Sequence, residues 1–220
     1  MSTHASLRDQ LRSIPVFSGQ LPTFDPDDAP AAPLPLLISW LEEAIEAGVS
    51  QPHAMTLATA SATGEPSART LLLKDVDGGA VWFASMSTGP KGRDIDENPR
   101  VALTMYWREQ GRQVRIVGDA EEGPRDVSEA DFLARSPGAR ASAVAGRQSE
   151  PIAPTEIVEE LVADARTLIA VEPDFVPAGW TAYRVVPTSV EFWQADRERD
   201  QIRLHFARVN DAWERQILWP

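Results

Sequence analysis

Short runs of alternating apolar and polar residues, separated by tight-turn signals, constrain this chain more than any other feature. The sequence DGG at 77–79 precedes the run at 80–86, which is the pattern of a hairpin with glycines in its turn. The runs at 100–107 and 112–122 flank a second turn signal in the same way. Further strands are expected at 54–61, 66–74, 180–187, 189–194, 201–209 and 212–219. Evenly spaced strands joined by tight turns favour an antiparallel barrel.

Helices are expected around these strands. Apolar residues recur at helical spacing from Leu37 to Ile45, and Gly48 provides a C-terminal stop. Pro90 suits the first position of a short helix that ends before Pro99. Further helices are expected at 128–133, 139–146 and 156–171. There is no βαβ alternation and no glycine-rich nucleotide motif, so the predicted fold class is mainly β with α (α+β).

Residues 1–35 form a proline-rich N-terminal segment, here called the arm. Its prolines favour extended or turn backbone over helix. Two interpretations remain open: a disordered leader, or an arm that folds over a site or over a partner subunit. Residues 36–220 are expected to form one domain, because a domain commonly has about 150 residues.

Composition excludes several classes of function. Lys plus Arg number 21 and Asp plus Glu 33, and the net charge of −12 argues against binding nucleic acid or anionic membranes. The absence of cysteine excludes disulfides, thiolate nucleophiles and Cys-ligated metals. The histidines at 4, 53 and 205 lack ligand spacing, so no metal site is expected. A cytoplasmic location is expected, because no apolar run could span a bilayer and the start lacks an apolar signal core.

Cationic and amide side chains on strands are the informative polar feature of this acidic sequence. Arg69 and Lys74 bracket the apolar run TLLL. Lys91 stands at the start of the short helix, where free N–H groups already favour an anion. Gln113 and Arg203 lie on later strands. Each alone is typical of a solvated surface, but together they indicate a pocket for a phosphate-bearing aromatic ligand.

Six ordered segments of the chain resemble the pyridoxamine 5′-phosphate oxidase family. They are ARTLLLKDVD, STGPKGRDIDENPRVAL, YWREQGRQVRIVGDAE, GRQSE, VEFWQ and NDAWERQILWP, and the resemblance extends from about residue 36 to the C-terminus. It implies an antiparallel split β-barrel with peripheral helices, a homodimer, and FMN bound at the subunit interface. It also implies that the chain is an FMN-dependent oxidoreductase.

The resemblance further implies which residues bind FMN. Arg69 and Lys91 would bind its phosphate, and Gln113 would hydrogen-bond the isoalloxazine ring. The pair at 148–149 would reach FMN from the partner subunit. The complete implied set is Arg69, Thr70, Leu71, Leu72, Lys74, Ser85, Lys91, Gln113, Gln148, Ser149, Trp193 and Arg203. Pro90 stands where the family has an arginine, so one cation is missing from the phosphate site.

The substrate end of the site departs from the vitamin-making enzymes of the family. Asp131 stands where they have a tyrosine and Ala139 where they have a serine. A carboxylate that faces the site would repel a substrate phosphate. The residues implied at the substrate are Lys74, Asp131, Arg135 and Arg199, and those implied in catalysis are Arg199, Gln201 and Lys74.

The late strand can be aligned with the family in two registers. Without a gap, Arg199 and Gln201 occupy the R-x-H position of the family, and Arg203 stays on FMN. A literal R-x-H occurs four residues later, at 203–205. The apolar alternation from Ile202 to Phe206 favours the ungapped register.

The expected function is an FMN-dependent oxidase. It would transfer a hydride from a small (hetero)aromatic or reduced tricyclic, phenazine-precursor-like substrate to flavin N5, with O2 as acceptor and H2O2 as product. The runs at 106–109 and 147–150 are similar to the phenazine-biosynthesis branch of the family. Two alternatives remain: a true pyridoxine/pyridoxamine 5′-phosphate oxidase that makes pyridoxal 5′-phosphate, and a non-catalytic flavin or pyridoxal-phosphate binding protein.

Overall fold

The computed structural model describes residues 6–17, 19–146, 148–152, 155–196 and 201–220, except for the side chains of 155 and 156. Its strands are β1 Ala54–Ala60, β2 Pro66–Leu72, β3 Asp75–Asp77, β4 Ala80–Met86, β5 Arg100–Trp107, β6 Arg112–Glu122, β7 Trp180–Gln194, β8 Ile202–Val209 and β9 Ala212–Ile217. Its helices are α1 Leu7–Ser13, α2 Pro33–Glu46, α3 Pro90–Glu97, α4 Arg125–Leu133, α5 Pro137–Ala145 and α6 Thr155–Val171. Short 3-10 turns occupy Pro26–Asp28 and Arg108–Gln110.

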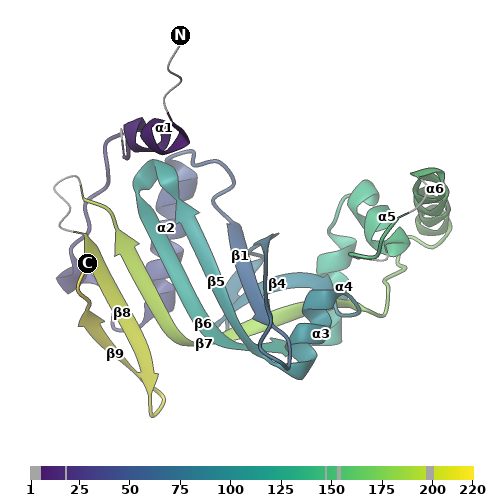
Figure 1. Cartoon of the computed structure of the whole chain (residues 1–220). Helices are drawn as coiled ribbons and strands as arrows, with labels where there is room; N and C mark the ends of the chain where they lie inside the picture. The colour runs from purple at the N-terminus through teal and green to yellow at the C-terminus, as the bar shows by residue number, and fades with distance from the viewer. Residues whose placement is uncertain (1–5, 18, 147, 153–154, 197–200) are drawn as a thin grey trace, which may run out of the picture.

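The described strands form one antiparallel sheet that curls into an open barrel (Figure 1). Their order is β2-β1-β5-β6-β7-β4-β3, with β8 paired to β7 and β9 to β8. The two ends of the curl approach each other where Lys74 N, just after β2, donates to Trp82 O on β4 at 2.8 Å. This arrangement confirms the predicted antiparallel split barrel with peripheral helices.

The turn signals of the sequence are confirmed. Gly78 and Gly79 have φ angles of 58° and 77°, which a two-residue turn between β3 and β4 requires. Asn210 and Asp211 adopt positive φ angles between β8 and β9. Strands β5 and β6 and helix α3 have the predicted bounds within one residue.

One predicted break in the sheet is wrong. The runs 180–187 and 189–194 form a single strand, β7, because a bulge absorbs the irregularity. The pairing shifts between Val117 and Gly118, so that Gly118 lies opposite Pro187 and Val117 opposite Ser189. A Cβ at position 118 would stand 2.3 Å from the carbonyl oxygen of Val186, so glycine lets the two backbones approach.

Several helix bounds also differ from the prediction. α2 begins at Pro33, inside the arm, since proline in a first turn loses no intrahelical hydrogen bond. α1 lies within the stretch expected to avoid helix, and the Ser6 side chain caps it by accepting from Asp9 N. α4 begins at Arg125 rather than at Ser128. The strands β2 and β9 end two residues earlier than predicted.

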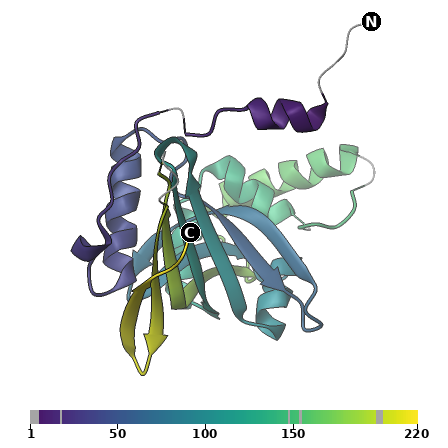
Figure 2. The ribbon, with the colours of Figure 1, turned by 60° about the vertical axis from the view of Figure 1, so that its left-hand side comes forward.

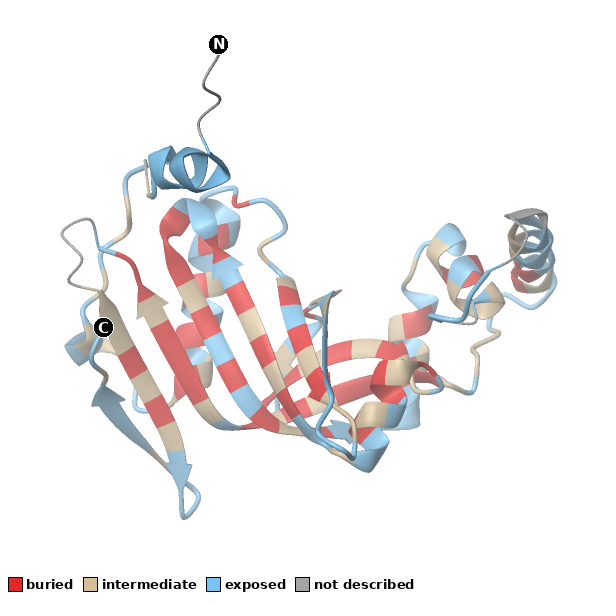
Figure 3. Cartoon of the chain, viewed as in Figure 1, coloured by how far each residue is buried: buried red, intermediate tan, exposed pale blue. Residues whose placement is uncertain are grey.

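The main core lies between α2 and the sheet. Buried residues alternate along the strands, and Figure 3 shows them as stripes. Trp40 of α2 meets Phe192 of β7 edge-on with ring centroids 5.2 Å apart, and Phe192 meets Phe206 of β8 at 5.9 Å. The opposite face of β5–β8 is therefore left to carry polar side chains.

The second half of the arm packs on the barrel (Figure 2). Phe24 lies edge-on against Trp40 at 5.0 Å, and the Phe17 ring lies 6.0 Å from that of Trp193. Arg215 of β9 donates to the Ala29 carbonyl at 2.7 Å. This part of the arm therefore packs on the barrel of its own chain, and its place over a site or a partner subunit stays a prediction. In the part of the chain that the structure describes, no helix is long and apolar enough to cross a membrane.

Candidate functional site

Lys91 is the centre of the first cluster of predicted site residues. It lies in the first turn of α3 and is 5% exposed. Its Nζ donates to Ser85 Oγ of β4 at 2.9 Å and to Gln148 Oε1 at 2.7 Å. Burial, and then the positive charge of Arg69, lower the pKa of Lys91 to about 8. The structure thus brings four predicted FMN residues together, with Gln148 on the lysine of its own chain.

Arg69 reaches the same place from β2. Its guanidinium donates to Thr59 Oγ1 at 2.9 Å and to Ser67 Oγ at 2.7 Å. Thr59 in turn donates to Asp94 Oδ2 at 2.6 Å. Partial burial lowers the pKa of Arg69, and the charge of Asp94 opposes that effect. Among the described residues no carboxylate comes within salt-bridge distance of Arg69 or Lys91.

The start of α3 adds main-chain donors beside these two cations. Gly89 caps the helix without a side chain, so the first N–H groups of α3 have no capping partner. Gly92 permits a close approach of backbone, because a Cβ there would stand 2.1 Å from the carbonyl oxygen of Ser87. Two neighbouring cations with no salt-bridged carboxylate among the described residues, a hydroxyl and a helix N-terminus form a donor set that fits the dianionic phosphate of FMN.

The second cluster joins three of the predicted substrate residues. Lys74 Nζ lies 3.0 Å from Asp131 Oδ1 of α4, and the indole Nε1 of Trp180 donates to Asp131 Oδ2 at 3.0 Å. The Arg135 guanidinium stacks over the Trp180 ring at 4.3 Å. Burial lowers the pKa of Arg135, and the Asp131 charge opposes this. The fourth predicted substrate residue, Arg199, lies outside the described residues.

At position 139, where vitamin-making members of the family have a serine, Arg135 contacts the main chain of Ala139 instead. Its Nη2 donates to the carbonyl oxygen of Ala139 at 3.2 Å, and its Nε is buried without a hydrogen-bond partner. A buried unpaired N–H carries a desolvation cost of about 1–3 kcal/mol. The cation is therefore incompletely paired beside Asp131.

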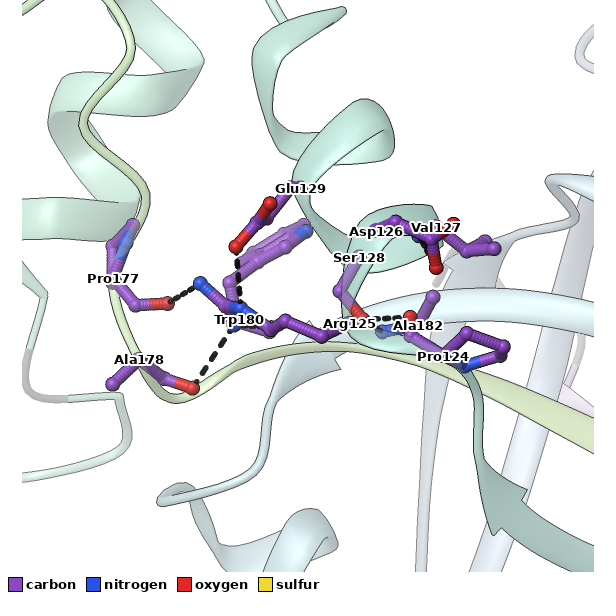
Figure 4. A network of polar contacts seen from close by, with 10 residues as sticks. All are labelled: Pro124, Arg125, Asp126, Val127, Ser128, Glu129, Pro177, Ala178, Trp180 and Ala182. Carbon is purple, nitrogen blue, oxygen red and sulfur yellow. Dashed lines mark hydrogen bonds and ion pairs between the residues drawn. The ribbon is translucent and has the colours of Figure 1, made fainter.

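Arg125 anchors the helix that carries Asp131, and the sequence analysis missed this residue. Figure 4 shows the network: Arg125 Nη1 donates to the carbonyls of Ala178 and Trp180 at 3.2 and 3.1 Å. Nearby, the main-chain N–H of Ala182 donates to Ser128 Oγ at 3.0 Å. These contacts fix α4 against the start of β7, which holds the Asp131 carboxylate against the Trp180 indole. An arginine that follows a proline is not a recognisable sequence signal for this role, so Arg125 could not be identified from the sequence alone.

The third group forms a row across three strands. Gln113 of β6 lies opposite Trp193 of β7, which lies opposite Arg203 of β8. The side chains lie on the face away from the core, since the residues on either side of them in these strands are buried, apart from the half-buried Ile202. Gln201 joins the row, because it accepts from Trp193 Nε1 at 3.0 Å. His205 lies farther along β8 and contacts Ser189 Oγ at 3.0 Å.

The remaining predicted residues lie on exposed backbone. Residues 70–72 belong to β2, which is an edge strand of the described sheet, so one side of its backbone is left for a ligand. Ser149 follows α5 with a φ of 68° and is exposed. No side-chain hydrogen bond or salt bridge among the described residues joins the Lys91 cluster, the Asp131 cluster and the row on β6–β8. The assignment of all these residues to FMN or substrate stays a prediction.

Family models match most of the chain. Residues 41–169 match the model described as Pyridoxamine 5'-phosphate oxidase. Residues 180–220 match the Pyridoxine 5'-phosphate oxidase C-terminal dimerisation region, which supports the predicted homodimer. The Lys91 and Asp131 clusters lie mainly in the first match, and Trp193 and Arg203 lie in the second.

Curated relatives and solved structures agree with these matches. A pyridoxine/pyridoxamine 5'-phosphate oxidase of Rubrobacter xylanophilus is 42% identical over 194 residues, 88% of this chain and 89% of the relative. One from Bordetella petrii is 40% identical over 180 residues, 82% and 85% of the two chains. PhzG from Burkholderia lata, solved with tetrahydrophenazine-1-carboxylic acid, has a TM-score of 0.85 at 30% identity and covers 92% of this chain and 100% of its own. An FMN-binding protein from Nostoc punctiforme, with a TM-score of 0.71, 18% identity, and coverage of 87% and 100%, supports the fold alone.

Proposed function

Since the chain belongs to the pyridoxamine 5′-phosphate oxidase family, whose cofactor is FMN, we propose that it is an FMN-dependent oxidase whose substrate carries no phosphate. The proposed substrate is a small (hetero)aromatic or reduced tricyclic molecule. Its hydride would pass to flavin N5, and O2 would accept the electrons to give H2O2. The observation that carries this proposal is the Asp131 carboxylate, which is paired with Lys74 and lies beside Arg135, the two cations that a substrate phosphate would need.

The Lys91 cluster is the proposed phosphate end of the cofactor site. Bound FMN would supply the hydride acceptor. Arg69, Lys91 and the first N–H groups of α3 would hold its phosphate, and Ser85 and Gln148 would surround the lysine ammonium. Charge supports this, because a phosphate near −2 would meet two cations that have no carboxylate in contact within the described residues.

The row on β6–β8 is the proposed ring end, and two subunits would complete each site. Trp193 and Arg203 lie within the region that matches a dimerisation region. Gln113 lies beside Trp193 and would donate its amide to the ring. Among the described residues no hydrogen bond or salt bridge joins Arg69 or Lys91 to this row, which supports a site assembled from both protomers.

The Asp131 cluster is the proposed substrate end. Both carboxylate oxygens are already occupied, one by the Lys74 ammonium and one by the Trp180 indole. A phosphate placed there would face this carboxylate, which is only 15% exposed and therefore weakly screened. A ring that brings no anionic group to Asp131 meets no such repulsion.

A specific observation also favours the alternative of a true vitamin oxidase. The curated relatives at 42% and 40% identity are named pyridoxine/pyridoxamine 5'-phosphate oxidases. The PhzG structure, in contrast, was solved with a tricyclic acid that has no phosphate, at 30% identity. The two proposals differ in what occupies the space beside Asp131.

The test is turnover of the FMN-loaded protein under air, with H2O2 as the readout. Pyridoxine 5′-phosphate is expected to be a poor substrate, because each lost charge-assisted contact costs about 1.5–3 kcal/mol, and two losses lower kcat/KM by about two to four orders of magnitude. Turnover of this phosphate with kcat/KM near ~10⁴ M⁻¹s⁻¹ or above would overturn the proposal.

A panel of reduced aromatics separates the oxidase from a non-catalytic binding protein. H2O2 production with a dihydro- or tetrahydro-tricyclic substrate is the expected result. A flavin-loaded dimer that is silent with the whole panel and with pyridoxine 5′-phosphate would favour the binding protein instead.

A further inference from the structure

Three contacts within its own chain hold the Arg203 side chain. Its Nε donates to Glu191 Oε1 at 3.0 Å, and its Nη2 forms an ion pair with the same oxygen at 3.0 Å. Its Nη1 donates to the main-chain carbonyl of Trp219 at 2.8 Å. A guanidinium carries five N–H groups, so two of them take no part in these contacts. The group is therefore fixed in orientation and still has donors for a ligand.

Glu191 is the acidic half of this arrangement. It lies on β7 two residues before Trp193, on the same face of the strand, and is 7% exposed. Its second oxygen, Oε2, lies 3.6 Å from Arg115 Nη2. A buried carboxylate is stable only when cations pair with it, so the two arginines and Glu191 depend on one another. Two cations against one carboxylate leave a net positive charge beside Trp193.

The C-terminal tail, Leu218–Pro220, supplies the third contact through its backbone. β9 pairs with β8 as far as Ile217 opposite Leu204, and Leu218 N then donates to the carbonyl of Arg203 at 2.9 Å. This hydrogen bond places the next carbonyl, that of Trp219, at the guanidinium. The Trp219 side chain itself is 91% exposed. The tail thus acts on Arg203 with main-chain atoms and not with the indole.

We propose that Glu191 and the Trp219 carbonyl are positioning groups for the cofactor, so that the last two residues of the chain belong to the FMN site. They would act through Arg203, by holding its guanidinium on the face that carries Gln113 and Trp193. This inference rests on the proposed function, which places Arg203 at FMN. A flexible arginine would lose side-chain freedom on binding, and a held one has already lost it.

The test compares FMN dissociation constants of the dimer for matched variants. Removal of Trp219-Pro220 should raise the Kd about five- to tenfold, because a released arginine must again lose its side-chain freedom when FMN binds. Trp219→Ala keeps the carbonyl and should leave the Kd within about twofold. Glu191→Gln keeps the side-chain shape without the charge and should raise the Kd about tenfold. Sizing of each variant establishes that the dimer is intact.

A double-mutant cycle separates this inference from the assignment of Arg203. In an Arg203→Ala background the truncation should have no further effect on the Kd. An unchanged Kd after truncation, an equal loss in both backgrounds, or a loss in Trp219→Ala equal to that of the truncation would overturn the inference alone. An unchanged Kd in Arg203→Ala itself would overturn the placement of Arg203 at FMN and the inference with it.

Discussion

The Lys91 and Asp131 clusters are built from the same kinds of residues but differ in their counter-ions. Arg69 and Lys91 stand side by side, and no described carboxylate forms a salt bridge with either. Lys74 and Arg135 enclose the carboxylate of Asp131. In the first cluster the charge of Asp94 acts on Arg69 only from beyond salt-bridge distance, whereas in the second a carboxylate forms a direct ion pair with Lys74.

This difference explains how proteins with the same fold can bind the same cofactor and yet act on different substrates. Binding of an anion stabilises the first cluster, because the anion offsets the repulsion between Arg69 and Lys91 and the cost of burying the Lys91 charge. An anion stabilises the second cluster much less, because it must either displace the Asp131 carboxylate or lie beside it. Substitution of a single residue on α4 would therefore alter the substrate preference and leave the proposed FMN phosphate site unchanged.

The largest expected effect is on FMN binding by the first cluster. Lys91→Ala and Arg69→Ala should each cost about 1.5–3 kcal/mol of FMN affinity, since each removes a charge-assisted hydrogen bond to the phosphate. Riboflavin, which has no phosphate, should lose much less. Fluorescence titration with both ligands measures this. Arg93→Ala, an exposed arginine on the same helix, is the matched control. Equal losses for the two ligands would show that Arg69 and Lys91 are structural.

The second prediction removes the anion from the second cluster. Asp131→Asn keeps an acceptor for Trp180 Nε1 but frees Lys74 and Arg135, so kcat/KM for pyridoxine 5′-phosphate should rise about 10- to 100-fold. The double change Asp131→Tyr with Ala139→Ser should raise it further. FMN affinity should stay constant, and Asp126→Asn on the same helix controls for net charge. If Asp131→Asn leaves the phosphate turnover unchanged, Asp131 does not set the substrate class.

The third prediction concerns pH. The Lys91 ammonium, whose pKa is lowered to about 8, is the form that attracts phosphate, and it is lost in the FMN-free protein as the pH rises through that value. FMN affinity should therefore fall by up to about tenfold per pH unit above pH 8, since the FMN phosphate is already a dianion there. Lys91→Arg should bind FMN with a flat profile over about pH 7.5–9.5, because arginine stays protonated. A steep profile in Lys91→Arg would assign the titration to another group.

The lowered pKa of Lys91 also affects the free energy of unfolding of the FMN-free protein, and this effect increases with pH whereas FMN affinity falls. The ordinary pKa of lysine is 10.5, so between about pH 8 and 10.5 the unfolded chain binds more protons at this residue than the FMN-free fold. The contribution of Lys91 to the free energy of unfolding therefore rises with pH across this window. Denaturant titrations of FMN-free protein should show the rise, and Lys91→Met should lack it.

The sequence predicted the positions of the strands and the start of α3 because both depend on local chemistry. Gly78-Gly79 directly indicates a turn, and Pro90 directly indicates the start of a helix. The break before Ser189 was predicted wrongly, because a bulge opposite Gly118 depends on pairing between distant strands. The α1 helix was missed because the neighbouring prolines outweighed its Ser6 cap.

The pairings within the site could not be predicted in the same way. Sequence alignment placed Lys74, Asp131 and Arg135 at the substrate, but not the direct contact of Lys74 with Asp131. That contact needs α4 to dock beside the start of β7, and the docking depends on Arg125, which reaches main-chain carbonyls about 50 residues away. Because the acceptors are main-chain carbonyls, the identities of residues 178 and 180 do not reveal these hydrogen bonds.

The smallest expected effect tests this docking. Arg125→Ala removes hydrogen bonds to the carbonyls of Ala178 and Trp180, and should lower the free energy of unfolding by about 1 kcal/mol, or Tm by about 2–4 °C. Glu129→Ala removes only the exposed ion pair with Arg125 and should change Tm by less than about 1 °C. FMN affinity should stay within about twofold in both, because α3 and β2 carry the phosphate cluster and α4 does not. Substrate turnover should fall in Arg125→Ala and not in Glu129→Ala, since only the former loosens Asp131. A loss of FMN affinity equal to the loss of turnover would mean that the two clusters are coupled through the barrel, and the contrast between them would not hold.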